Sequence, residues 1–349
     1  MAFTSPASPA VSVVLAVHNG ERYLREAVES VLAQSLSDFE LVAIDDGSTD
    51  ATGAILADYA ANDSRIVVHR QANAGVAEAR NRGFTLASAP LVASLDADDV
   101  VLPTRLEQQR EFMTHHPEVA VVGGAVSFID ADGREFGEWR YPSTDAAIRS
   151  ALAHTTPLAH SATTIRKDAF FAVGGYRRLL APAEDLDLWL RIAERQELAN
   201  LAVVMVRYRV HREQATVRRC EAQALGSLGA RIAARARAEG RPDPLDTIDR
   251  IDRGTLLGIG ATEEDVAAAV VHTLTWVART LGKAGYVRDS ERLFLEAKRR
   301  ARAEAFPELA VHVHRQHARL HREQGRRVPF ALESLRAIRA GRGAREPRG

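Results

Sequence analysis

The stretch from Ala89 to Leu102 constrains the fold more than any other part of the chain. A short apolar run follows Pro90 and ends in three acids, Asp96, Asp98 and Asp99. This pattern predicts a buried strand that brings carboxylates to the carboxyl edge of a sheet, where open α/β sheets bind ligands. Two carboxylates in an Asp-x-Asp spacing can both reach a hard divalent cation, whose coordination is often completed by substrate phosphates. The alternative is a plain acidic turn, because Asp is common in turns.

Strand-like and helix-like segments alternate before and after this stretch. The expected strands are residues 11–17, 39–44, 65–69 and 119–129, and helices are expected at 22–34 and 104–115, with others ending near residues 62 and 88. Such alternation predicts a mainly parallel, Rossmann-like α/β sheet with helices on both faces. The first turn, His18-Asn19-Gly20, has no Gly-x-Gly-x-x-Gly, which argues against a dinucleotide fold of the usual fingerprint.

Two further turns carry candidate binding residues. Asp46 follows the second strand, and its carboxylate could accept hydrogen bonds from a base or ribose. Ser48, Thr49 and Asp50 next to it are explained by helix capping, so only Asp46 is assigned a functional role. Arg80 is expected in the early turns of the third helix, where a guanidinium could hold a base or phosphate. A solvated surface arginine is the alternative.

A second group of acids begins a later helix, where Glu184 and Asp185 follow the glycine-rich turn 174–176. The helix macrodipole stabilises acids in a first turn, which is a sufficient structural explanation for their presence. It does not explain their position after a glycine-rich turn, with the aromatic Trp189 close by. Further on, His211 could be a third metal ligand or a phosphate contact, although a lone histidine in a loop is commonly just solvated.

The composition is that of an ordinary globular protein. Of 349 residues, 46% are hydrophobic and 26% charged, and the formal net charge of +0 gives no field that would attract nucleic acid. The single cysteine, Cys220, fits a reducing cytoplasm. Residues 1–10 lack the basic region of a signal peptide, and no apolar run is long enough to span a membrane. We therefore expect a soluble, cytoplasmic protein without a nucleic-acid partner.

The last third of the chain is predicted to be helical. Thr262 and Asp265 have the spacing of a capping box, which predicts a helix through Leu281, followed by helices at about 290–303 and after Pro307. From Arg326 onward the tail has seven Arg against two Glu. This charge makes the tail a candidate for peripheral contact with the inner face of the cell membrane, with a solvated terminus as the alternative.

The motifs, in their order, resemble those of the family 2 glycosyltransferases, which have the GT-A fold. The matching segments are Val13–Asn19, Asp45–Asp50, Asn73–Asn81, Leu95–Asp99, Gly174–Tyr176, Glu184–Asp185 and Tyr208–His211. The resemblance predicts a catalytic domain over residues 9–220, followed by a helical C-terminal region, 221–325, and a basic tail, 326–349. It covers nothing beyond about residue 220.

The resemblance implies inverting transfer from a nucleotide-diphosphate sugar, with a UDP-sugar favoured, to a hydroxyl of a glycan or lipid-linked acceptor. Asp185 corresponds to the general base, and Mn²⁺ or Mg²⁺ is the implied cofactor. The implied binding residues are Val17, His18, Asn19, Asp46, Arg80 and Asp96 for the nucleotide sugar; Asp98, Asp96 and His211 for the metal; and Glu184, Trp189 and His160 for the acceptor. His18 stands where the family commonly has Tyr, and it can still stack on a base.

Two other functions compete with this one. A non-catalytic nucleotide-sugar-binding scaffold, acting through the helical region, is disfavoured because both acid clusters are intact. A nucleotidyltransferase also uses an α/β sheet with metal-binding Asp, but would be expected to carry a basic, glycine-rich loop near its amino end, and none is seen.

Overall fold

The computed structural model of the protein describes residues 9–303 and 306–325, which form two compact units. Of these described residues, the first unit contains those up to Ile129, then Gly137–Arg178 and Glu184–Arg209; the second contains Asp130–Phe136, Leu179–Ala183 and those from Val210 onward. The basic tail expected at 326–349 lies outside the described residues. The predicted domain limits stay a prediction.

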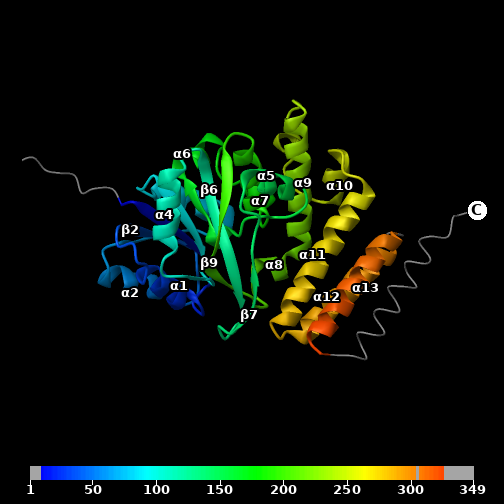
Figure 1. The fold of residues 1–349 in the computed structure, drawn as a ribbon, viewed down its shortest axis with the longest axis horizontal. Helices are drawn as coiled ribbons and strands as arrows, with labels where there is room; N and C mark the ends of the chain where they lie inside the picture. The colour runs from blue at the N-terminus through cyan, green and yellow to red at the C-terminus, as the bar shows by residue number, and fades with distance from the viewer. Residues whose placement is uncertain (1–8, 304–305, 326–349) are drawn as a thin grey trace, which may run out of the picture. The chain divides into compact units, whose positions relative to one another are not determined.

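The first unit is built on a mixed, mostly parallel sheet with the strand order β3-β2-β1-β4-β8-β6-β9-β5, and β7 pairs with β6. Figure 1 shows the long strands β6 and β9 of this sheet side by side. The strands are β1 (Val11–Val17), β2 (Phe39–Asp46), β3 (Ile66–Gln71), β4 (Leu91–Asp96), β5 (Val100–Val101), β6 (Val119–Ile129), β7 (Glu135–Trp139), β8 (Thr164–Arg166) and β9 (Glu197–Arg209). The pairs among β1, β2, β3 and β4 are parallel, as is β6 with β9, whereas β8 and β5 run antiparallel to their neighbours.

The register of the central strands places the polar turns at one edge. Ala16 of β1 lies opposite Asp96 of β4, and Val17 lies opposite Asp45 of β2. The β1 side chains are almost all buried, as expected for a strand covered on both faces. The turns that follow β1, β2 and β4 therefore lie next to one another at the carboxyl edge.

Helices cover both faces of this sheet, as predicted. Val13 and Leu15 of β1 belong to a core that also contains Val28 of α1, whereas Val14 points to the opposite face. There a side chain at Gly83 of α3 would come within 2.4 Å of Val14, so the glycine lets α3 pack closely on β1. The helices of this unit are α1 (Leu24–Leu32), α2 (Thr52–Asn62), α3 (Val76–Leu86), α4 (Arg105–His115), α5 (Asp145–Leu152), α6 (Lys167–Ala172) and α7 (Glu184–Ala193).

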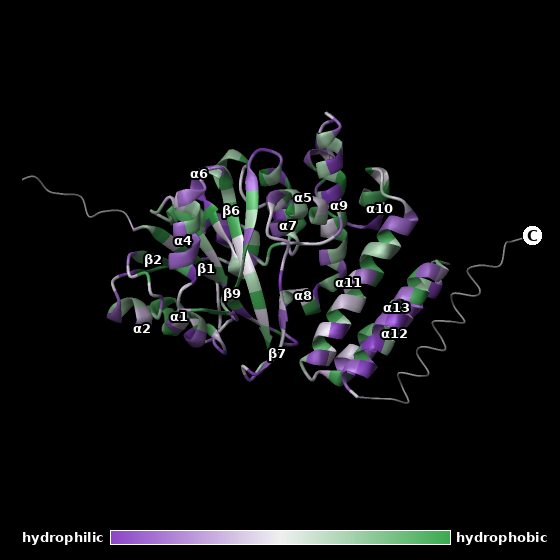
Figure 2. Cartoon of the chain, viewed as in Figure 1, coloured by the Kyte–Doolittle hydropathy of each residue, from purple (hydrophilic) through white to green (hydrophobic). Residues whose placement is uncertain are grey.

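The second unit is helical, which confirms the prediction for this region. Its helices are α8 (Ala215–Arg218), α9 (Cys220–Ala238), α10 (Arg253–Gly258), α11 (Glu263–Lys283), α12 (Val287–Ala303) and α13 (Pro307–Glu323). The predicted capping box is present, because Thr262 Oγ1 accepts the Asp265 amide and Asp265 accepts the Thr262 amide. α11, α12 and α13 pack on one another around Leu281, Phe294 and Val313. Figure 2 shows long hydrophilic stretches on α12 and α13.

The ends of several helices differ from the predictions by a few residues. α1 begins at Leu24, where the sequence predicts residue 22, and α12 begins at Val287, where it predicts residue 290. The earlier start of α12 follows Gly285, whose φ of 87° reverses the chain directly after α11. Within the described ranges, no helix is sufficiently long and apolar to cross a bilayer.

Candidate active site

The turns after β1 and β2 are tied together by side chains predicted to bind the nucleotide sugar. His18 Nδ1 lies 2.9 Å from the carbonyl oxygen of Asp46. Asn19 adopts a left-handed backbone with φ 54°, and its Oδ1 accepts a hydrogen bond from the Thr49 amide at 2.8 Å. His18 and Asn19 are exposed, whereas Val17 beneath them is buried. The structure thus brings three of the predicted nucleotide-sugar residues to one edge, with His18 open to a ligand.

Asp46 is buried and holds the loop that leads into α3. Its Oδ1 accepts the Ala74 amide and Gln71 Nε2, both at 2.8 Å, and its Oδ2 accepts the Gly75 amide at 2.9 Å. These bonds give Asp46 a positioning role, because they fix the loop beside His18. Its predicted contact with a base or ribose stays a prediction.

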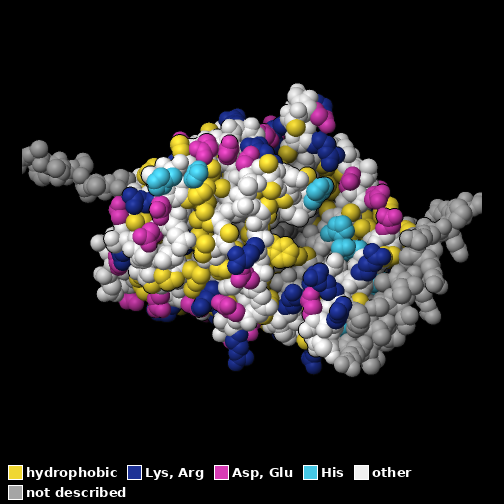
Figure 3. Space-filling model, viewed as in Figure 1, with side chains coloured by type: hydrophobic (Ala, Val, Ile, Leu, Met, Phe, Trp, Pro, Cys, Tyr) yellow, Lys and Arg dark blue, Asp and Glu magenta, His cyan; other side chains and the backbone are white. Residues whose placement is uncertain are grey.

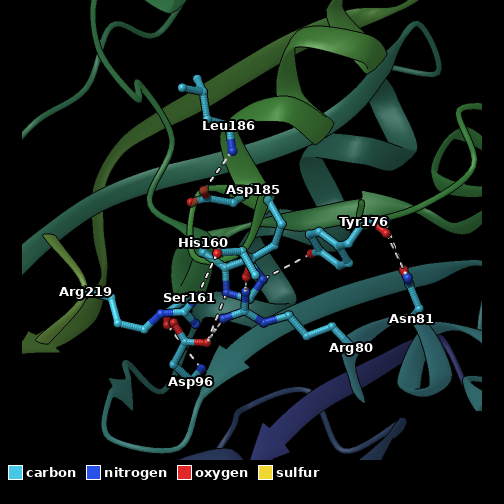
Figure 4. Close-up of polar contacts among 11 residues, drawn as sticks. Arg80, Asn81, Asp96, His160, Ser161, Tyr176, Asp185, Leu186 and Arg219 are labelled. Atoms are coloured by element: carbon cyan, nitrogen blue, oxygen red, sulfur yellow. Dashed lines mark hydrogen bonds and ion pairs between the residues drawn. The ribbon is translucent and has the colours of Figure 1, made fainter. Parts of the chain in front are cut away.

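Arg80 lies between two acids that are far apart in the sequence, Asp96 and Glu184, and Figure 4 shows its contact with Asp96. Its Nη2 donates to Asp96 Oδ1 at 2.6 Å, and its Nη1 donates to Glu184 Oε1. Burial alone would lower the pKa of Arg80, but the two carboxylates raise it. Burial alone would raise the pKa of Asp96, but Arg80 and then His160 hold it below its usual range. Arg80 therefore stays charged and keeps Asp96 ionised.

His160 extends this cluster toward the glycine-rich turn. Its Nδ1 lies 3.2 Å from Asp96 Oδ1, and its Nε2 lies 3.1 Å from the Tyr176 hydroxyl, as Figure 4 shows. The amide side chain of Asn81 fixes Tyr176 through both backbone groups, each at 2.9 Å. Ser161 Oγ accepts the Asp96 amide at 3.1 Å. Helix α3, strand β4 and the loop before β8 thus position one polar group of side chains.

Asp185 lies in the first turn of α7, where its Oδ1 accepts the Leu186 amide at 2.7 Å. Burial and then the negative charge of Glu184 raise the pKa of Asp185 to about 6, although His160 and Arg80 oppose the shift. A carboxyl group with this pKa is largely ionised at neutral pH, yet is a stronger base than an ordinary aspartate. This is the protonation behaviour that general base catalysis favours.

The Asp98–Asp99 turn is held by a buried arginine of β9. Arg209 donates from its backbone amide to Asp99 Oδ1 and from Nε to the Asp98 carbonyl, both at 2.8 Å, while its guanidinium lies 4.5 Å from the centroid of the Tyr23 ring. Burial, followed by the charges of Asp98 and Asp96, raises the pKa of Asp99 well above its usual value. Asp99 is therefore a structural acid, whereas the Asp98 side chain is partly exposed.

The donor set of this turn fits a hard divalent cation. Arg80 and His160 both contact Oδ1 of Asp96, so Oδ2 of Asp96 and the carboxylate of Asp98 are the oxygens that could bind one. His211, the third predicted ligand, belongs to the second unit, where its Nδ1 accepts the Glu213 amide at 3.2 Å. Its role as a metal ligand stays a prediction.

Trp189, predicted to contact the acceptor, is completely buried. Its ring lies in the interior of the first unit because it is on the inward face of α7, so direct contact with an acceptor would require this region to open. On the same helix Arg191 donates to Asp187 Oδ2 at 2.8 Å and to the Gly175 carbonyl at 2.7 Å. α7 thus supports the glycine-rich turn as well as carrying Glu184 and Asp185.

Several of these supporting residues have no role that the sequence patterns predict. They are Asn81, Ser161, Tyr176, Asp187, Arg191 and Arg209. Four of them, Asn81, Tyr176, Asp187 and Arg209, lie in or beside the family motifs at 73–81, 174–176, 184–185 and 208–211. Their position in these motifs could have marked them as site residues, but it could not have identified their partners, which are distant in the sequence. Ser161 has no comparable signal.

Comparisons with known proteins agree with this geometry. The family model described as glycosyl transferase family 2 matches residues 12–174. EpsE of Bacillus subtilis (strain 168) is 37% identical over 190 residues, which cover 53% of this chain and 67% of EpsE. The amylovoran biosynthesis glycosyltransferase AmsE of Erwinia amylovora is 32% identical over 212 residues, which cover 60% of this chain and 79% of AmsE.

Solved structures show the same fold at low sequence identity. S. aureus TarS 1-349 in complex with UDP-GlcNAc superposes with a TM-score of 0.52 at 16% identity, covering 97% of this chain and 93% of that one. The complex of the same protein with UDP gives a TM-score of 0.51. The fold, the ordered motifs and the extent of the AmsE match lead to one conclusion: the chain belongs to glycosyl transferase family 2.

Proposed function

We propose that this glycosyltransferase transfers a sugar, with inversion, from a UDP-sugar to a hydroxyl of a glycan or lipid-linked acceptor. The observation that carries the proposal is Asp185, a carboxyl group with a pKa of about 6 beside the Arg80–Asp96–Glu184 cluster. The UDP-GlcNAc complex of TarS supports a UDP-sugar donor. The name of AmsE, a glycosyltransferase of amylovoran biosynthesis, supports a polysaccharide or its precursor as acceptor.

The chemistry requires one proton transfer at the acceptor. The carboxylate of Asp185 accepts the proton of the acceptor hydroxyl while that oxygen bonds to the anomeric carbon, and the bond from this carbon to the diphosphate oxygen breaks on the opposite face. Glu184 is held in place by its contact with Arg80, and its negative charge keeps the pKa of Asp185 raised. His160 joins Asp96 to Tyr176 and could position an acceptor hydroxyl.

The donor would lie along the carboxyl edge of the sheet. The exposed ring of His18 could stack on the base, next to the loop that Asp46 holds in place. Asp96 and Asp98 would bind Mg²⁺ or Mn²⁺, which would offset the charge that develops on the departing diphosphate. Arg209 contributes by fixing the backbone of the Asp98–Asp99 turn.

The proposal is tested by nucleotide release from a panel of UDP-, GDP- and TDP-sugars, with Mn²⁺, Mg²⁺ or EDTA. We expect release from a UDP-sugar that depends on the divalent ion and is stimulated by a hydroxyl-bearing glycan acceptor. In single-turnover experiments at saturating substrates, Asp185→Asn should reduce turnover by about 10²–10⁴-fold, the usual size of a general-base contribution. Donor affinity should change little, because the base acts on the acceptor.

Asp168 supplies a matched control. It is an exposed acid in the first turn of α6, and its Oδ1 accepts the amide of the next residue at 2.7 Å, as Asp185 Oδ1 does. Asp168→Asn should therefore leave turnover unchanged. Near wild-type turnover in a folded Asp185→Asn protein would remove the base assignment and direct attention to Glu184.

A further inference from the structure

The helical unit contains a cluster of two histidines and a glutamate that the transfer reaction does not use. His317 and His321 lie one turn apart on the same face of α13, and Glu291 faces them from α12. Among the described residues, only these three His, Cys, Asp or Glu side chains form a group of three whose ligand atoms all lie within 4.8 Å of one another. Figure 3 shows histidine side chains in cyan on the surface of this helical part of the chain, whereas the two histidines of the cluster are buried beneath the surface.

Both imidazoles turn the same nitrogen toward the carboxylate. His317 Nε2 lies 3.0 Å from Glu291 Oε2, and His321 Nε2 lies 3.8 Å from Glu291 Oε1. Ligand atoms that share a tetrahedral zinc ion at about 2.0–2.1 Å lie about 3.3 Å apart. Because the three ligand atoms already lie within 4.8 Å of one another, side-chain adjustments of up to about 1.5 Å would give Zn²⁺ two nitrogens and one oxygen.

The surroundings hold the two rings in place. The imidazole of His317 stacks on Phe294, with centroids 4.2 Å apart and an angle of 21° between the planes, and lies 4.3 Å from the ring of His321. Both histidine side chains are almost completely buried, whereas Glu291 is 43% exposed. The exposed carboxylate gives a metal ion a route from solvent, and the fixed rings reduce the entropy lost on binding.

Lys298 is the group that competes with a metal ion. Its Nζ lies 2.8 Å from His317 Nδ1, so without metal it donates to that nitrogen, and the ring proton is on Nε2, facing Glu291. Coordination through Nε2 needs the lone pair there, which moves the ring proton to Nδ1. The ammonium group of Lys298 must then turn away, and its flexible side chain allows this.

We propose that Glu291, His317 and His321 form a zinc site that joins α12 to α13. Two His and one carboxylate are a known three-ligand set for Zn²⁺, which leaves the fourth position to water. The site lies within the second unit, whereas the Asp98–Asp99 turn belongs to the first unit. The proposed zinc site therefore does not depend on the proposed transfer reaction.

The test uses the full-length protein after treatment with EDTA. We expect Zn²⁺ to bind with a well-defined stoichiometry in titration calorimetry and to raise the melting temperature. Co²⁺ should give the visible absorption of a low-coordinate nitrogen and oxygen site. Glu291→Gln and His321→Gln should each weaken Zn²⁺ binding by more than about 100-fold, beyond the range typical of changes to residues that only support a ligand. Lys298→Met should strengthen it, because methionine has no hydrogen-bond donor that competes for His317 Nδ1.

Two controls separate this site from other binding. His272→Gln alters a histidine whose ring lies 4.5 Å from that of His312 in the same unit, and it should leave Zn²⁺ affinity unchanged. The Co²⁺ titration is repeated in an Asp98→Asn background, which removes a carboxylate proposed to bind a divalent cation in the other unit, and the absorption band should persist there. Because Glu291 is partly exposed, its substitution should not prevent folding. Equal Zn²⁺ affinity in the wild type, Glu291→Gln and His321→Gln would overturn the proposal.

Discussion

At the scale of single residues, the raised pKa of Asp185 has a cost in stability as well as a use in the proposed catalysis. An unfolded chain releases this proton near pH 3.8, but the folded protein holds it to about pH 6, because burial and Glu184 disfavour the carboxylate. The folded state thus binds more protons than the unfolded state between these values. Stability falls as pH rises through this range, and the loss is complete above about pH 6.

Asp185→Asn should therefore stabilise the protein while it inactivates the enzyme. The shift of about two pKa units corresponds to about 3 kcal/mol, and because the side chain is partly exposed we expect a gain of about 1–2 kcal/mol at pH 7.5. The gain should disappear below about pH 4. Urea denaturation at both pH values measures it, and a loss of stability at pH 7.5 would show that Asp185 is not destabilising.

The turnover of the wild type should follow the same ionisation. Because the base must be unprotonated, turnover should fall about tenfold per pH unit below about pH 6 and level off above it. A profile of single-turnover rates between pH 5 and pH 8 checks this. A flat profile through pH 6, with the protein folded throughout, would argue that the proton goes to another group.

Asp98→Asn should abolish the part of donor affinity that depends on Mn²⁺, because it removes a charged ligand and keeps the side-chain volume. Titration calorimetry with and without Mn²⁺ measures this part. The chain offers a control with the same local sequence, since Asp130-Ala-Asp132 repeats Asp96-Ala-Asp98 in a hairpin turn. Asp132→Asn should leave Mn²⁺-dependent affinity intact, and an equal effect of both variants would exclude the assignment of Asp98.

At the scale of elements, the glycine-rich turn before Tyr176 contains two glycines under different constraints. Gly174 and Gly175 both have positive φ, 80° and 69°. A Cβ on Gly174 would meet nothing within 4 Å, but a Cβ on Gly175 would lie 2.7 Å from Asn81 Oδ1 and 2.9 Å from Phe170. Position 174 requires glycine only because of its left-handed backbone. Position 175 requires glycine for the same reason and also because the Asn81 side chain approaches it closely.

Gly174→Ala should accordingly lower the free energy of unfolding by about 1–2 kcal/mol, the cost of a left-handed backbone. Gly175→Ala adds overpacking, typically about 1–3 kcal/mol, and should also displace Asn81 and Tyr176. Urea denaturation of the two variants compares the costs directly. Equal losses in both would indicate that the Asn81 amide moves aside freely and does not fix Tyr176.

At the scale of the whole molecule, the chain divides into two compact units, and we expect their unfolding to be separable. Thr262→Ala removes a capping bond of α11 in the second unit and should cost about 1 kcal/mol there. Gly175→Ala acts in the first unit. In a Trp276→Phe background the remaining tryptophans, Trp139 and Trp189, both report on the first unit.

Tryptophan fluorescence in that background should shift to lower urea with Gly175→Ala but not with Thr262→Ala. Far-UV circular dichroism, which also detects α9 to α13, should respond to both. The opposite outcome is that Thr262→Ala shifts the fluorescence transition as much as it shifts the circular dichroism transition. The molecule would then unfold as one cooperative unit, for which a single free energy of unfolding is well defined.

The sequence by itself determined the segments that form β1, β2, β3, β4 and β6, whereas the short strands β5 and β7 were not predicted. Buried strands such as Val11–Val17 and Leu91–Asp96 are continuous apolar runs, and the Thr262 cap depends on a spacing of three residues. Both features can therefore be predicted from short stretches of sequence. The glycosyltransferase family and the GT-A fold are predicted by the motifs and confirmed by the comparisons. The scaffold and nucleotidyltransferase alternatives are thereby set aside.

Only the tertiary structure decided how these residues meet. Arg80 contacts Asp96, 16 residues away, and Glu184, 104 residues away, and this contact helps set the charge environment of Asp185. Arg209 fixes a turn 110 residues earlier. Such pairings follow from strand order and helix packing, which local sequence patterns do not encode. A pKa depends on burial and on the charges nearby, so the protonation of a site is decided only when the chain has folded.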